Sequence, residues 1–254
     1  MSNYDFNSIG RIVSYCTALF IFSGASAVAQ NHADQTNNIT AQIDSLYTIV
    51  GVKYYRDFDS TRIYINKILD IAENHQRWTD YLKALYTLSW CADYHKRMTE
   101  FRALIADGNQ FMAQHSVDLE QTDPDFTHRA GMINATGLYY FSISDYARAI
   151  EEYSRVISLS TKPLGQDSSV IWSTCNYLAQ SYHEIGNFDL SLQYFDLGNR
   201  YLNPRDPEYQ FQQAMYMMYQ GQSSFALKQY DRAFAAYRKS TTLLERLPYH
   251  PRIR

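Results

Sequence analysis

GLYYFSISDYARAIEEY, residues Gly137–Tyr153, is the first of three copies of one pattern in this chain. The pattern returns as AQSYHEIGNFDLSLQYF at Ala179–Phe195 and as GQSSFALKQYDRAFAAY at Gly221–Tyr237. Each copy opens with a small residue, and the openings at 137, 179 and 221 are each 42 residues apart. A fixed period of this length is typical of an array of helical hairpins, none of which can bury its apolar face alone.

Within each copy, small residues and rings recur at matched positions. We expect the small residues to let the backbones of adjacent hairpins approach closely. The closing rings should fill the gap between one hairpin and its successor. This structural signature consists of Gly137, Tyr140, Ala149, Tyr153, Ala179, Tyr182, Phe195, Gly221, Ala233 and Tyr237.

Apolar residues at helical spacing extend the array toward the N-terminus. One helix is expected to bury Ile39, Ile43, Leu46, Tyr47 and Val50, and the next Ile63, Ile65, Ile68, Leu69 and Ala72. We therefore predict an all-α chain of about five antiparallel hairpins near residues 39–76, 79–115, 130–163, 172–205 and 214–248. Residues 30–38 are expected to be a flexible terminus, and residues 249–254 a truncated or frayed tail.

The second of these hairpins matches the pattern poorly. In the expected alignment, Cys91 and Ala103 take the small positions, but Asp107 stands where the closing ring should be. The connections carry clearer signals. Asp123-Pro124 and Asp206-Pro207 are each predicted to supply an N-cap followed by proline in the first helical turn.

The N-terminus has the features of a secretory signal. Arg11 precedes an apolar run over residues 12–22, and the small-residue triplet Ala27-Val28-Ala29 follows it. We predict residues 1–29 to be a signal peptide cleaved after Ala29, which would make the chain an exported protein. An uncleaved membrane anchor is the alternative, although the run is shorter than the roughly 20 residues that a helix needs to span a membrane.

The charge, the cysteines and the motif content exclude several classes of function. The net charge is −3 and no basic stripe is evident, so we expect no nucleic-acid partner. Cys91 and Cys175 belong to different hairpins and are expected to be buried thiols rather than a disulfide. Cys91 and His95 share a helix face, but two ligands without a second pair do not make a metal site. With no catalytic motif found, we predict no enzyme, no catalytic residue, no cofactor and no metal.

The three copies resemble tetratricopeptide repeats, and their 42-residue period is similar to that of the kinesin-light-chain-like subclass. Leu164-Gly165-Gln166-Asp167 resembles the connection found between repeats of that subclass. The chain departs from the family at Ser224, where an aromatic is expected, and at Ser191, where alanine is expected. The resemblance implies a right-handed α-solenoid whose inner helices line a concave groove that binds a protein or peptide.

Carried over residue by residue, the family's inner positions predict the groove. Asn134 and Asn176 are equivalent positions whose amides could bind a peptide backbone, or alternatively bond to neighbouring helices or water. The methionines and Phe225 would form an adaptable apolar patch, unless they pack between repeats. The predicted groove residues are Asn134, Leu138, Phe141, Asn176, Gln180, His183, Met215, Met218, Gln222 and Phe225.

The sequence is compatible with two hypotheses about the whole protein. The first is a complete scaffold in the periplasm or cell envelope of a Gram-negative-type bacterium, with self-association through an open C-terminal repeat. The second is a fragment, because such repeats behind a signal peptide resemble the N-terminal regions of bacterial sensor kinases, transcription regulators and caspase-like (CHAT) peptidases. No kinase, DNA-binding or peptidase module lies in the chain itself.

Overall fold

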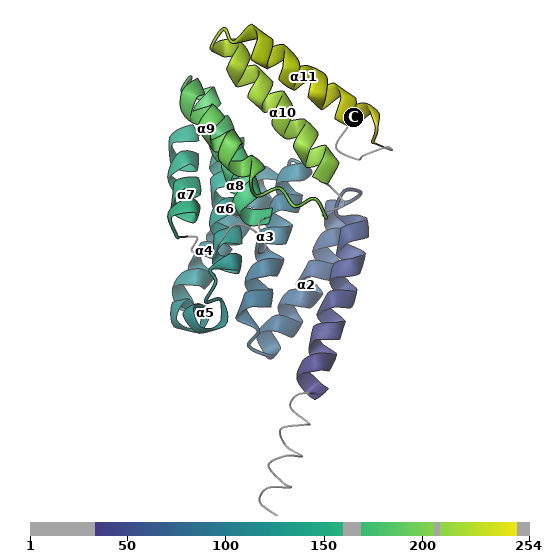
Figure 1. Cartoon of the computed structure of the whole chain (residues 1–254). Coiled ribbons are helices and arrows are strands. Elements are labelled where there is room, and N and C mark those ends of the chain that lie inside the picture. Colours follow the sequence, from purple (N-terminus) through teal and green to yellow (C-terminus); the bar gives the residue numbers. More distant parts are fainter. Residues whose placement is uncertain (1–33, 160–168, 206–208, 248–254) are drawn as a thin grey trace, which may run out of the picture. The chain divides into compact units, whose positions relative to one another are not determined.

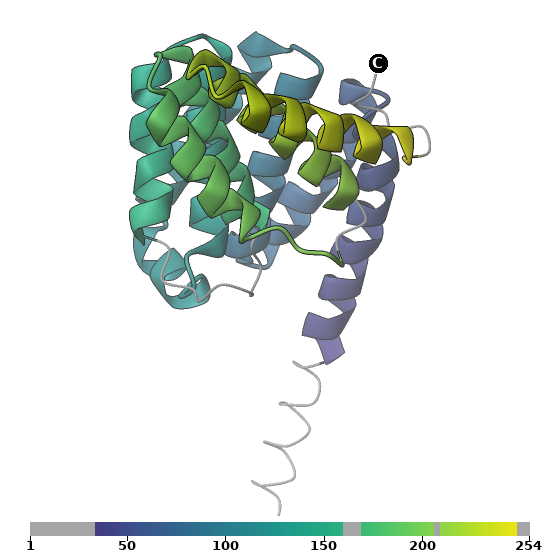
Figure 2. The ribbon, with the colours of Figure 1, turned by 45° about the horizontal axis from the view of Figure 1, so that its top comes forward.

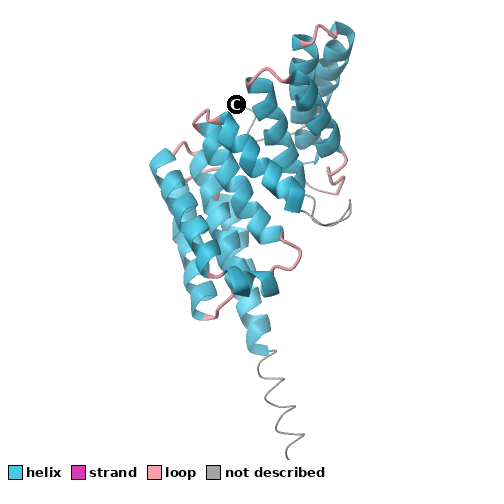
Figure 3. Ribbon diagram, turned by 90° about the vertical axis from the view of Figure 1, so that its left-hand side faces the viewer, coloured by secondary structure: helices cyan, strands magenta, loops and turns pink. Residues whose placement is uncertain are grey.

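A computed structural model describes residues 34–159, 169–205 and 209–247, and every regular element in these ranges is an α-helix (Figure 3). The contacts divide the chain into two units at Ile49 and Val50. Of the first unit, residues 34–49 are described and are helical, and the helix continues to residue 53. The predicted signal peptide, the Leu164–Asp167 connection, Asp206-Pro207 and the 249–254 tail lie outside the described residues.

The second unit continues with ten further helices among its described residues (Figure 1). They are α2 (Phe58–Asn74), α3 (Trp78–Tyr94), α4 (Met98–Gln114), α5 (Ser116–Thr122), α6 (Thr127–Ser142), α7 (Tyr146–Leu159), α8 (Ser169–Glu184), α9 (Phe188–Asn199), α10 (Tyr209–Ala226) and α11 (Tyr230–Glu245). Two features differ from expectation. The first helix covers residues 34–38, which were expected to be flexible, and α5 lies between the hairpins predicted near 79–115 and 130–163, where no helix was predicted.

The helices of the second unit form an α-solenoid of antiparallel hairpins, as predicted. α3 packs with α4, α6 with α7, α8 with α9 and α10 with α11. Each hairpin also packs on the next, since α6 contacts α3, α4 and α8, while α10 contacts α8 and α9. Figure 2 shows α11 lying along α10. The extra helix α5 packs against α3 and α4, and its insertion accounts for the longer sequence step between the second and third hairpins.

One turn geometry joins helices across the unit. In each case a residue with positive φ follows the helix, and the next amide donates to the carbonyl five residues back, as from Asp145 N to Tyr140 O (2.8 Å). This is the Schellman motif, which satisfies carbonyls at the end of a helix. The left-handed residues are Gln76, Lys96, Ser144, Gly186 and Lys228, with φ between 54° and 80°. Four of the five are therefore not glycine.

In the regular hairpins, an aromatic ring from the second helix packs directly against a small residue on the first helix. We call the space above such a small residue a seat. A Cβ on Gly137 would lie 2.6 Å from the ring of Tyr153, and one on Gly221 would lie 2.6 Å from the ring of Tyr237. Ala179 shares a core cluster with Phe195. Our expectation that these residues let neighbouring backbones approach is thus corrected, because what approaches them is a ring from the second helix of the same hairpin.

The closing rings do reach the next hairpin, as expected. Tyr153 stacks on Tyr177 of α8, with ring centroids 6.0 Å apart and an interplanar angle of 13°. Phe195 stacks on Tyr219 of α10 at 6.0 Å and 1°. Each ring therefore belongs to two interfaces: it fills the seat in its own hairpin and presents its outer side to the following one.

The alignment expected for the second hairpin is wrong by two residues. Counting back from the left-handed turn residue, Gly137 precedes Ser144 by seven positions, and Ser89 precedes Lys96 by the same number. The structural counterparts of the signature are therefore Ser89, Phe101 and Ile105, all buried. Of the residues chosen from sequence, Cys91 is buried, but Ala103 and Asp107 are exposed.

Two further local expectations need correction. Asp123 caps α6, but from outside the helix: its carboxylate accepts hydrogen bonds from the amides of His128 and Arg129 at 2.9–3.1 Å. Pro124 is not in the first turn, because α6 begins at Thr127 after Phe126, whose φ is +60°. On α2, Ile63 was assigned to the apolar stripe, yet it is 57% exposed.

Candidate functional site

The first helices of the fourth and fifth hairpins carry a partly exposed stripe in the register predicted for the groove. On α10 these residues recur every three or four positions and so lie on one side of the helix. The stripe consists of Asn176, Gln180 and His183 on α8 and of Met215, Met218, Gln222 and Phe225 on α10. We call these seven residues the binding face.

The same register is buried on α6. Asn134 is 1% and Leu138 is 5% exposed. Nδ2 of Asn134 donates to Oγ1 of Thr174 at 2.8 Å, which ties α6 to α8. Phe141 is half-buried and packs edge-on against Tyr177, 5.6 Å away. These three predicted groove residues therefore pack between hairpins, because α6 is flanked by α3 and α8 and contacts both.

Asn176, the equivalent of Asn134, is placed differently. The residue in the register of Thr174 is Tyr216, whose side chain packs edge-on against Phe195, 5.4 Å away. Among the described residues, Oδ1 of Asn176 is buried without a hydrogen-bond partner, and so is the hydroxyl of Tyr216. The bond that closes the interface at Asn134 is thus not repeated, and Asn176 stays half-buried at the margin of the binding face.

His183 is held by a short polar chain that spans three helices. Its Nδ1 lies 2.9 Å from Oγ of Ser223 on α10, and that oxygen lies 2.8 Å from Oγ of Ser191 on α9. Both serines are fully buried. These contacts explain why serine stands at position 191 in place of the expected alanine, because the Ser191 hydroxyl links hairpin four to hairpin five. One edge of the His183 ring is therefore fixed.

Phe225 anchors the open end of the binding face. It is 52% exposed, and its ring meets Tyr230 of α11 at 5.4 Å and 66°. The same contact across the turn occurs between Phe141 and Tyr146 and between His183 and Phe188, again as edge-on pairs. These pairs were not predicted from the sequence. Their signal is two rings five residues apart, on either side of each turn, repeated at the 42-residue period.

The cysteines and histidines do not form a reactive site. Sγ of Cys91 and Nε2 of His95 both donate to the carbonyl of Tyr54, at 3.6 and 2.8 Å. Burial raises the pKa of the Cys91 thiol to about 11 and that of Cys175 to about 12, so both stay protonated at neutral pH. No group of three metal-ligating side chains occurs within the described ranges. No helix in those ranges is long and apolar enough to cross a membrane.

Comparison with known proteins supports the fold. No family model matches the chain, and no curated protein matches it. Among solved structures, BtubC (BKLC) from P. vanneervenii is similar with a TM-score of 0.57 and 13% identity, over 85% of this chain and 95% of that one. A putative kinesin light chain with TPR-like repeats from Podosopora anserina gives 0.54 and 11%, over 82% and 95%. At such identities the likeness shows a TPR-like solenoid and nothing finer.

Proposed function

We propose that this protein is a helical-repeat scaffold that binds a protein or peptide through the binding face on α8 and α10. A TPR-like solenoid fits a role in protein interaction generally. The observation that carries the specific proposal is the contrast in one register: Asn134 and Leu138 are buried on α6, whereas the equivalent α10 positions, Met218 and Gln222, reach the surface.

The chemistry of the face favours an uncharged, partly apolar ligand. Met215, Met218 and Phe225 offer flexible and aromatic apolar surface, and Gln180 and Gln222 offer amides that both donate and accept. No Arg or Lys belongs to the face, so it lacks the cations that clamp a terminal carboxylate or a phosphate. We therefore propose an internal peptide segment with apolar side chains as the ligand.

Export to the periplasm or cell envelope is part of the proposal and rests on the sequence of residues 1–29 alone. The alternative, that the chain is the sensory or regulatory region of a larger signalling or CHAT-type protein, rests on the resemblance alone. Both give the repeat array the same task, because in either case the binding face would recognise a polypeptide.

A peptide selection tests the binding face directly. The full chain is used to select binders from a phage-displayed library of random peptides, and the affinity of a selected peptide is measured by fluorescence anisotropy. A Met218→Glu variant should bind at least about tenfold more weakly, because a carboxylate would be desolvated against apolar ligand atoms.

The matched control is Ile63→Glu, which places the same charge at an exposed apolar residue on α2. It should bind the peptide as the wild type does. Equal affinities for wild type and Met218→Glu, or a selection that yields no binder, would overturn the proposed binding face while leaving the fold untouched.

A further inference from the structure

The outer side of α11 is open where its counterparts in α7 and α9 are covered. In the 42-residue register, Phe234 corresponds to Ile150 and Leu192. Ile150 is half-buried against the core cluster of Tyr153, and Leu192 is 6% exposed. Phe234 is 65% exposed. Within the described residues, the phenyl ring of Phe234 is therefore exposed at a position whose counterparts are buried or half-buried elsewhere in the array.

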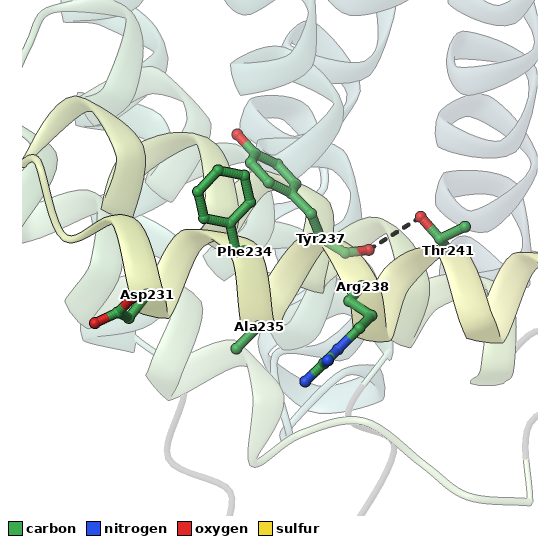
Figure 4. A pocket seen from close by; sticks show the side chains of 6 residues that line it. All are labelled: Asp231, Phe234, Ala235, Tyr237, Arg238 and Thr241. Atoms are coloured by element: carbon green, nitrogen blue, oxygen red, sulfur yellow. Dashed lines mark hydrogen bonds between the residues drawn. The ribbon is translucent and has the colours of Figure 1, made fainter.

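The exposed ring borders a shallow hollow along α11. Six residues of this helix line it: Asp231, Phe234, Ala235, Tyr237, Arg238 and Thr241. Figure 4 shows two rows, with Phe234 and Tyr237 pointing to one side and Asp231, Ala235 and Arg238 to the other. We call this surface the outer face of α11.

The outer face is complementary to a second copy of itself that runs in the opposite direction. Asp231 and Arg238 lie equally far from the point between Phe234 and Ala235, on opposite sides of it. Seven residues of helix separate the two charges by about 10.5 Å. The part of the chain that the structure describes gives neither side chain an ion-pair partner. An antiparallel copy of the same helix would therefore place an opposite charge beside each of them.

We propose that two copies of this chain associate through the outer face of α11, with the two helices antiparallel about a two-fold axis between residues 234 and 235. Such an axis lies in the interface, so each row meets the same row of the second copy. Asp231 then pairs with Arg238 of the second copy, and this happens twice. Phe234 packs against Phe234, and the small Ala235 beside the axis lets the helices approach.

This association is independent of the proposed binding face, which lies on α8 and α10. It uses charge complementarity and one buried aromatic pair, and because it involves a single helix from each copy we expect a weak, reversible dimer. A partner protein that docks a different helix on this surface would not need Asp231 and Arg238 to be symmetrically placed.

Charge reversal in the full chain tests the symmetry, with sedimentation velocity over a range of concentrations as the measurement. Asp231→Arg and Arg238→Asp should each weaken dimerisation at least about tenfold, since each sets like charges together twice. The double variant should regain near wild-type dimerisation. Arg102→Asp, a reversal at an exposed residue of α4, is the control and should change nothing.

Cross-linking gives a second readout. An Ala235→Cys variant would carry its thiol next to the axis and should give a disulfide-linked dimer on mild oxidation. A Thr242→Cys variant, at a residue that is also exposed on α11, should not. A wild type that stays monomeric at every concentration would overturn the proposal. So would a dimer that ignores the single reversals, a double variant that does not recover, or cross-linking at Thr242 as efficient as at Ala235.

Discussion

The regular hairpins and the junction between α4 and α6 both use glycine to seat a large side chain, but they do so in opposite ways. In α6/α7, Gly137 on the first helix receives Tyr153 from the second helix of the same hairpin. At the junction, Gly131 on α6 receives Tyr86 from the preceding hairpin, and Gly108 on α4 receives Met132 from the following one. A repeating seat inside hairpins produces a visible period, whereas seats between hairpins leave none.

The largest expected effect comes from filling a seat that holds a rigid ring. Tyr153 is fully buried and stacked on Tyr177, so it cannot withdraw from a leucine at position 137. We expect Gly137→Leu to cost about 3 kcal/mol and Gly221→Leu, whose Tyr237 is only half-buried, about 1–3 kcal/mol. The thermal midpoint should fall by roughly 2–4 °C per kcal/mol.

Gly51 supplies the control for these overpacked variants. A Cβ at Gly51 would meet nothing within 4 Å, so Gly51→Leu should leave the midpoint unchanged or raise it slightly. If the Gly137→Leu variant melts at the same temperature as the wild type, the Tyr153 ring does not occupy the space above Gly137, and the packing derived for the regular hairpins is wrong.

Glycine-to-alanine substitutions should distinguish the seats inside hairpins from those between hairpins. An alanine Cβ at position 137 would lie 2.6 Å from the Tyr153 ring, whereas one at position 108 would meet the sulfur and the terminal methyl of Met132. Thioether ends move easily, and alanine gains up to about 1 kcal/mol of helix propensity over glycine. We expect Gly137→Ala to cost about 1–2 kcal/mol and Gly108→Ala to be neutral within about 0.5 kcal/mol in urea unfolding. Equal losses would show that the junction is as rigid as the hairpins.

This contrast also explains how much of the fold the sequence could predict. The period of Gly137, Ala179 and Gly221 identified the helical class, the hairpins and the stacking of their rings. The second hairpin was aligned two residues off because Phe101 stands where the pattern has the small Ala149, and Ile105 stands where it has the ring of Tyr153. Its packing depends on α6 and α5, which local spacing does not reveal.

The binding face was predicted only in part, for a similar reason. The family register selected residues of α8 and α10 that are partly exposed, but it does not state how closely the neighbouring first helices pack. On α6, contacts with α3 and α8 bury Asn134 and Leu138. Exposure at a given repeat position depends on the spacing between hairpins, which is a tertiary property.

In a third arrangement the small residue lies on the second helix of the hairpin and packs against a cysteine of the first helix. Its pH dependence tests whether that thiol is buried in the folded state. Gly198 on α9 faces Cys175 of α8, whose Cβ would lie 2.9 Å from a Cβ at 198. Burial raises the pKa of Cys175 to about 12, while an unfolded thiol ionises near pH 8.5–9. Above that pH the unfolded state loses a proton that the folded state keeps, so stability falls as pH rises.

Cys175→Ala keeps the Cβ but removes the titrating group. Between pH 8 and pH 10, its free energy of unfolding should therefore fall by roughly 1.4 kcal/mol less than that of the wild type. Urea unfolding at the two pH values measures the difference, and tyrosine ionisation affects both proteins alike. Parallel losses would show that the thiol is accessible in the folded state, and reaction with a thiol reagent at pH 8 without denaturant would agree.

The smallest expected effects concern the turns, where the regular hairpins and the irregular region are built alike. Ser144 and Lys96 adopt the same left-handed conformation, φ 62° and 57°, although one belongs to the 42-residue pattern and the other does not. Glycine adopts this conformation without the steric cost of a Cβ. Ser144→Gly and Lys96→Gly should each stabilise the chain by up to about 1 kcal/mol, and Gly186→Ala should destabilise it by a similar amount. Differential scanning calorimetry of the three variants measures these shifts. A gain at Ser144 with a loss at Lys96 would mean that the side chain of Lys96 supports the irregular region, so that the two regions differ in their turns as well as in their seats.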